Sequence, residues 1–407
     1  MSVKIQLNVI PPHRPPVVVP PGTPSLLSEP MRRFRCNQKG CCCSGWDIPF
    51  RLEDFVRLAE HLDDKDREEM SRGVQLVLES PTEGDPQQQQ ILHSLKLAGV
   101  GDDKACRFLE PAGGCGVHAR HGLAALPDLC VDFPAFSYLQ EDHVELWFDP
   151  VCPEVLNQLD ESEAPLELYT QEGAFGDDGF DLRVAHTADK LGARIGGDRL
   201  EQSDLEGIRN ASVLALAEPR PVWKSLAALL HAYRRLRIGN EAAFEAVEPE
   251  DPQPFLRFLF SCVGAHGASI LAGSLGRYRR FIYAIDPAPL FARMPELLAH
   301  LEAWEPALEK WVAPHEDAIR PLAARWLAHR FGTPMIKGRG ELRNAADDIA
   351  QLYGTSLRYA AAIAATLEVP VDRALYKVAI GAAEFFFRSL NLPREALPSF
   401  AAPARNA

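Results

Sequence analysis

Cysteine placement constrains this chain of 407 residues more than any other feature of its sequence. Eight of its nine cysteines fall in one early stretch, at Cys36, Cys41, Cys42, Cys43, Cys106, Cys115, Cys130 and Cys152. A hydrophobic core has no need of three consecutive cysteines beside polar residues. Soft thiolates gathered in this way indicate a zinc or iron–sulfur site. Cys262 stands apart in an apolar stretch and is expected to be an ordinary core residue.

Disulfides and plain core packing are the alternatives to metal binding. The first thirty residues are rich in proline and lack the apolar helix of a secretory signal peptide, so we expect an extended tail over 1–30. We therefore place the chain in the cytoplasm, where thiols stay reduced, and favour metal over a disulfide framework.

The spacing of the cysteines predicts how the site is built. Neighbouring side chains point in different directions, so only one or two of the consecutive cysteines can reach the same ion. The other ligands must come from more than sixty residues downstream, and the site would tie two segments of the chain together. The favoured ligands are Cys36, Cys42, Cys106, Cys115 and Cys130. The eight cysteines could serve two four-thiolate sites, or one site with some thiols merely packed.

Two histidines and two tryptophans accompany the cysteines. His118 and His121 follow Cys115, and each is read either as a nitrogen ligand or as a solvated or hydrogen-bonded side chain. Trp46 and Trp147 are expected to shield the site, although core filling explains a tryptophan equally well.

The cysteine pattern resembles the metal-chelating cysteine-cluster domain of YkgJ-type proteins. The first half of the resemblance is the run Cys36-Asn37-Gln38-Lys39-Gly40-Cys41-Cys42-Cys43. The second half is Cys106-Arg107-Phe108-Leu109, Cys115-Gly116-Val117-His118, and Leu126-Pro127 with Cys130, Phe133 and Pro134. One departure is Lys39, which stands where the pattern has its second cysteine. Either Cys41 replaces that ligand through a shifted loop, or the site has lost one.

Within that group the chain is similar to the flagellin lysine-N-methylase family. The likeness rests on Cys43-Ser44-Gly45-Trp46, on His118 and Gly122 with Leu126-Pro127, and on Cys152-Pro153-Glu154. It covers residues 34–156, and the remainder is similar only in outline. The resemblance implies an iron–sulfur cluster of the 4Fe-4S kind, with zinc as the alternative. It also implies methylation of lysine side chains on a protein substrate, flagellin, with S-adenosylmethionine as the donor.

Downstream, apolar residues recur at helical spacing in several stretches. We expect one amphipathic helix over 222–236 and others around 255–259, 297–308, 319–331, 345–367 and 375–390, with Asp372 capping the last. The predicted fold is mainly α, an irregular cysteine-rich metal-cluster domain over 31–160 followed by a helical domain over 161–407.

Charge and motifs exclude several classes of function. The net charge of −13 argues against nucleic acid as a partner, and no apolar run is long enough to span a membrane. No phosphate-binding loop, hydrolase motif or glycine-rich donor site occurs, so catalytic and donor-binding residues stay unassigned. Two hypotheses remain: a lysine N-methyltransferase with a cysteine-bound cluster, or a non-catalytic zinc- or iron-chelating module whose helical domain binds a partner.

Overall fold

The structure is a computed structural model that describes most of the chain. The described residues are 23–35, 43, 48–50, 52–79, 92–101, 105–111, 113–139, 143–162, 168–171, 186–187, 194–195, 198–236, 253–265, 268–279, 282, 284–332 and 341–389. Cys36, Cys41, Cys42 and Trp46 lie outside them, as do residues 1–22 of the predicted tail.

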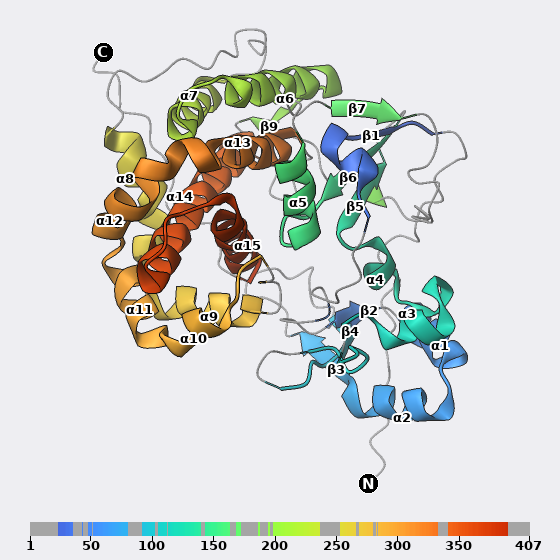
Figure 1. Cartoon of the computed structure of the whole chain (residues 1–407). Coiled ribbons are helices and arrows are strands. Elements are labelled where there is room, and N and C mark those ends of the chain that lie inside the picture. The colour runs from blue at the N-terminus through green and yellow to red at the C-terminus, as the bar shows by residue number, and fades with distance from the viewer. Residues whose placement is uncertain are drawn as a thin grey trace.

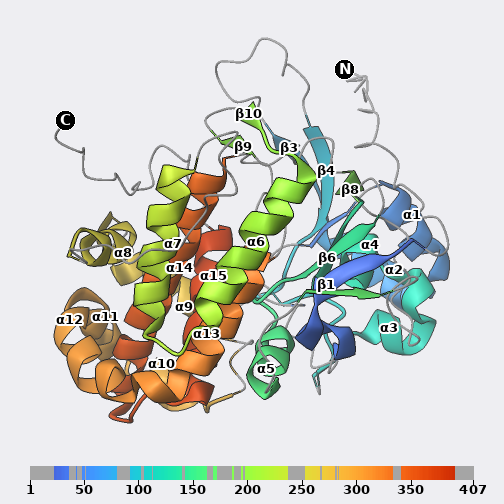
Figure 2. The ribbon, with the colours of Figure 1, turned by 90° about the horizontal axis from the view of Figure 1, so that it is seen from above.

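The described residues are mainly helical, as predicted. A bundle is built around α14 (Leu342–Leu367) and α15 (Arg373–Ser389), and the other helices surround this pair (Figures 1 and 2). The surrounding helices are α6 (Gln202–Ala217), α7 (Val222–Arg235), α8 (Gln253–Ala265), α9 (Ala268–Tyr278), α10 (Ala288–Ala292), α11 (Met294–Glu302), α12 (Trp304–Ala307) and α13 (Glu316–Gly332). Between α12 and α13 lie the π-helical turn η7 (Leu308–Val312) and the short 3-10 helix η8 (Ala313–His315).

The helices predicted from apolar spacing are present. α7 corresponds to the predicted 222–236, and α8, α13, α14 and α15 correspond to the stretches around 255–259, 319–331, 345–367 and 375–390. The predicted 297–308 is divided among α11, α12 and the start of η7. The predicted cap is confirmed, since Asp372 Oδ1 accepts a hydrogen bond from the Leu375 amide at 2.8 Å. The amide is one of the donors that a helix N-terminus leaves without an intrahelical partner.

A five-stranded sheet flanks the bundle, and the sequence did not predict it. Its strand order is β7-β1-β6-β5-β8, with β1 (Ser25–Ser28), β5 (Ala135–Leu139), β6 (Val144–Phe148), β7 (Leu168–Gln171) and β8 (His186–Thr187). All five residues of β6 are buried, so this strand lacks the alternating pattern that marks a strand in a sequence. β1 lies within the predicted tail and pairs in parallel with β6, more than a hundred residues away.

Two buried polar contacts join this sheet to the bundle. Glu145 of β6 accepts two hydrogen bonds from Arg209 of α6, at 2.6 and 3.1 Å, and both side chains are buried. His329 of α13 donates from Nε2 to the Phe148 carbonyl at 2.7 Å and therefore accepts at Nδ1 from the Ser28 hydroxyl at 3.1 Å. The short 3-10 helix η1 (Glu29–Arg33) and helix α5 (Pro153–Glu161) pack into the same core.

A second, smaller core lies in the cysteine-bearing part of the chain. It is covered by a three-stranded sheet of order β2-β4-β3 and by four short helices. These are β2 (Ile48–Phe50), β3 (Val74–Glu79), β4 (Leu92–Leu97), α1 (Leu52–His61), α2 (Asp64–Gly73), α3 (Gly116–His121) and α4 (Asp128–Asp132), with the 3-10 helix η3 (Leu123–Ala125). This region is therefore more regular than the predicted irregular domain, because β3 and β4 pair in register over their whole length. A two-stranded ribbon, β9 (Arg194–Ile195) and β10 (Asp198–Arg199), completes the described strands.

Candidate metal centre

Cys106 and Cys115 lie at the base of one tight loop. The Leu109 amide donates to the Cys106 carbonyl at 3.0 Å, and Leu109 pairs with Cys115 as an isolated β-bridge. Gly113 and Gly114 turn the chain with φ of 90° and 87°, a region that favours glycine. The loop geometry thus brings residues nine positions apart in sequence to the same end of the loop.

Cys43 lies directly against this loop. Its carbonyl oxygen accepts a hydrogen bond from the Cys106 amide at 2.6 Å. The segment of the triplet thus touches the downstream loop through the main chains of Cys43 and Cys106, whereas the predicted meeting of their sulfurs stays a prediction. The positions of Cys36, Cys41 and Cys42 lie outside the described residues.

Cys130 reaches the same small core from α4. Cys106, Cys115 and Cys130 are all half-buried and pack against it. The buried members of this core among the described residues are Ile48, Leu58, Leu62, Met70, Leu97, Phe108, Val117, Ala125 and Leu126. Three predicted ligands from two segments of the chain thus surround one set of apolar side chains.

Charged side chains fix the helix that carries Cys130. Asp54 of α1 accepts from the Asp128 amide at the start of α4, at 3.2 Å. Arg57 donates to Asp54 and Asp128, each at 2.6 Å, and to the Leu126 carbonyl at 3.0 Å. Because Asp54 is buried, its carboxylate needs these partners, and the contacts hold α4 against α1.

A second set of ion pairs ties the Cys106–Cys115 loop to α2. Arg120 of α3 bonds both Glu110 in the loop, at 2.7 Å, and the buried Asp66, at 3.0 and 3.1 Å. Arg107 reaches Glu69 at 2.8 Å, and this contact holds the pKa of Glu69 below its ordinary value. The loop is thus fixed at both of its sides.

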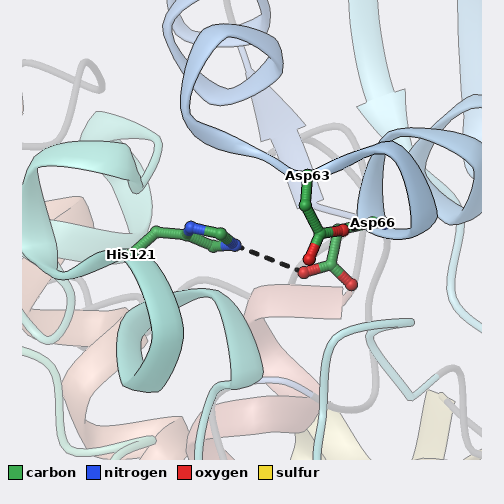
Figure 3. Close-up of side chains that lie close together, drawn as sticks. All are labelled: Asp63, Asp66 and His121. Carbon is green, nitrogen blue, oxygen red and sulfur yellow. Dashed lines mark hydrogen bonds and ion pairs between the residues drawn. The ribbon is translucent and has the colours of Figure 1, made fainter.

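Asp63, Asp66 and His121 form the one group of three or more ligand atoms within 4.8 Å that the described residues contain (Figure 3). Asp63 caps α2 by accepting from the Asp66 amide at 2.8 Å, which lowers the pKa of Asp63. His121 Nε2 lies 3.4 Å from Asp66 Oδ2, which also pairs with Arg120. The Arg120 guanidinium already supplies the positive charge that an ion would bring, so we read the group as a helix cap and an ion-pair network. For His121 the structure gives the hydrogen-bonded alternative of the sequence analysis.

Cys152 lies in a different environment from the other described cysteines. It is buried in the large core at the start of α5, beside Val151 and Val155, rather than on the small core. Trp147 is also buried, stacks on Phe136 at 5.3 Å and lies under the Arg330 guanidinium at 5.3 Å, so it fills space on the side of the large core. The sequence grouped Cys152 with the rest because position along the chain does not show which core a side chain joins.

The described cysteines do not form a compact group of sulfurs. No three of Cys43, Cys106, Cys115 and Cys130 bring their Sγ atoms within 4.8 Å of one another. Zinc–sulfur bonds of about 2.3 Å in a tetrahedron require sulfurs about 3.8 Å apart. A single zinc ion bound by three of these four residues is therefore not formed within the described part of the chain.

Comparison with known proteins adds no further assignment: no family model, no curated protein and no solved structure matches the chain. Within the described residues, no helix is long and apolar enough to cross a bilayer. Fold and site together define a mainly helical protein with a cysteine-bearing subdomain, made of the described residues among 43–131, that packs around the small core.

Proposed function

We propose that this chain is a metal-binding protein whose early cysteines hold an iron–sulfur cluster of the 4Fe-4S kind. The observation that carries the proposal is a main-chain contact between segments far apart in sequence: the Cys106 amide donates to the Cys43 carbonyl at 2.6 Å. Cys106 also packs on the same small core as Cys115 and Cys130. Cysteine thiolates are the usual ligands of iron–sulfur clusters.

The choice of a cluster over a single zinc ion rests on the resemblance of residues 34–156. In a cluster each thiolate binds a different iron, so its sulfurs stand farther apart than those around one zinc ion. Within the described part of the chain, no three cysteine sulfurs lie within 4.8 Å of one another, so no zinc-like set of three thiolates is formed there.

The ion pairs beside the small core also support the proposal. The Arg57 and Arg120 ion pairs hold Cys130 and the Cys106–Cys115 loop in place, which would lower the entropy cost of binding.

Metal analysis of protein purified without oxygen tests the proposal. We expect visible absorbance with iron and acid-labile sulfide in about equal amounts. Cys106→Ser, Cys115→Ser and Cys130→Ser should each lose most of the iron, whereas Cys262→Ser, in α8 of the bundle, should keep it. Colourless protein with stoichiometric zinc would contradict the cluster and support the alternative of a zinc-binding module. Protein without either metal would refute metal binding.

For catalysis we propose methyl transfer to a lysine side chain of a protein substrate, on the resemblance of residues 34–156 alone. Purified protein with its metal should transfer a labelled methyl group from S-adenosylmethionine to flagellin, and the Cys106→Ser variant should not. Retained metal without transfer to lysine would favour the non-catalytic alternative, in which the helical domain binds a partner. Metal analysis and methyl transfer thus test the two proposals separately.

A further inference from the structure

A cavity of about 400 Å³ lies among α11, η7 and the end of α14. Helix α11, which lines it, lies on the opposite side of the molecule from α1 to α4 in both views (Figures 1 and 2). Its polar and aromatic lining consists of Arg293, Glu296, His300, Lys310, Trp311 and Glu368, and Ala299 and Ala365 add an apolar surface. None of these residues belongs to the proposed metal centre.

Two unusual backbone conformations place side chains in this cavity. Lys310 and Trp311 belong to the π-helical turn η7, a rare conformation that is frequent at functional sites. Glu368 ends α14 in the left-handed region with φ of 58°, where glycine is the usual residue. A chain selected for stability alone would favour glycine there, so the Glu368 side chain itself needs an explanation.

The charges in the lining balance each other. Arg293 pairs with Glu296 and, at 3.2 Å, with Glu368. The Lys310 ammonium lies over the Trp311 ring, 4.6 Å from its centroid. Two acidic and two basic side chains thus surround one aromatic face, beside the carbonyl end of a long helix, which attracts positive charge.

His300 adds a polar ring to the lining. Thr366 uses its hydroxyl hydrogen to bond the Ala362 carbonyl at 2.7 Å. In the 3.1 Å contact between His300 Nδ1 and Thr366 Oγ1, His300 must therefore donate.

We propose that this cavity binds a small zwitterion, an α-amino acid with an apolar or aromatic side chain. Its ammonium group pairs with Glu368 at the end of α14, its carboxylate pairs with Lys310, and its side chain lies along Trp311 and the two alanines. A zwitterion matches a lining that carries both signs of charge, whereas a ligand with one charge meets like-charged side chains as well as opposite ones. The inference goes beyond the proposed metal function and does not depend on it.

Calorimetry of the full chain with three matched probes tests the charge requirement. L-phenylalanine carries both charges, phenethylamine only the ammonium, and hydrocinnamate only the carboxylate. We expect L-phenylalanine to bind with a dissociation constant between about 10 µM and 1 mM, and each single-charge probe to bind at least about 10-fold more weakly. Absence of L-phenylalanine binding at about 10 mM, or equal binding of a single-charge probe, would overturn the proposal.

Three variants locate the site and separate binding from folding. Trp311→Ala and Lys310→Met should each weaken L-phenylalanine binding by about 10-fold or more. Glu368→Gly should weaken it similarly while the unfolding temperature stays equal or rises, because glycine suits a φ of 58°. Glu309→Gln changes an exposed acid of the same turn that does not line the cavity, and should bind as the unchanged protein does. Unaltered binding by Glu368→Gly would contradict the assignment even if Trp311→Ala failed to fold.

Discussion

At the scale of single residues, Arg57 holds α1 and α4 of the cysteine-bearing subdomain together. It bonds two carboxylates and one carbonyl at the start of α4, and the Asp54 side chain is only 4% exposed. In Arg57→Met that carboxylate loses its cation, and we expect the free energy of unfolding to fall by about 2 kcal/mol in urea titrations. Arg67→Met is the control, since its contacts, with the fully exposed Asp64 and with the Ala59 carbonyl at 3.0 Å, are exposed and the expected change is below about 1 kcal/mol. Equal effects of the two changes would contradict this role.

Side-chain contacts differ in whether the sequence could predict them. Asp372 could be predicted as a cap because its partner, the Leu375 amide, is three residues away. Arg57 and Arg120 meet partners as far as 71 and 54 residues away, which no local pattern indicates. Asp63 capping α2 follows the same local rule as Asp372 and could have been found.

At the scale of elements, the junction of β1, β6 and α13 depends on a neutral histidine. Burial lowers the pKa of His329 to about 4, whereas an unfolded chain has a histidine pKa of about 6.5. Between these values the unfolded state takes up a proton that the folded state refuses, so stability is complete above pH 6.5 and falls as the pH decreases toward 4. The expected slope is at most about 1.4 kcal/mol per pH unit. Urea unfolding from about pH 7.5 to 5 should show this loss of stability in the unchanged protein and not in His329→Gln, which retains the other histidines. Equal slopes of the free energy of unfolding against pH in the two proteins would contradict the role of His329.

The contact of α14 with α8 depends on a glycine. A Cβ at Gly354 would overlap the Leu259 carbonyl, and we expect Gly354→Ala to lower the free energy of unfolding by about 2 kcal/mol despite the better helix propensity of alanine. Gly273→Ala in α9 meets nothing within 4 Å and should be neutral or stabilising by up to about 1 kcal/mol. Thermal unfolding of both variants distinguishes packing from propensity.

Helices and strands differed in how far the sequence predicted them. α7, α14 and α15 each carry an apolar stripe and could be predicted from local spacing, whereas α6 has only a weak stripe and was not predicted. The five-stranded sheet joins segments as distant as Leu26 and Glu145, and the uniform burial of β6 hides its strand pattern. Its existence depends on tertiary pairing, which a single sequence does not specify.

At the scale of the whole molecule, the described residues pack around two separate cores. The large core unites the bundle with the five-stranded sheet, and the small one lies against Cys106, Cys115 and Cys130. We predict that removal of metal destabilises mainly the small core, because a metal-bound site contributes its binding free energy directly to folding. Calorimetric unfolding should show two transitions, and metal depletion should lower only the first. Hydrogen exchange should then increase in α1 to α4 and stay slow in α14 and α15. Cys262→Ser, which leaves the early cysteines intact, should retain both transitions. A single transition that shifts as a whole on metal depletion would contradict the prediction, because the two cores would then unfold together.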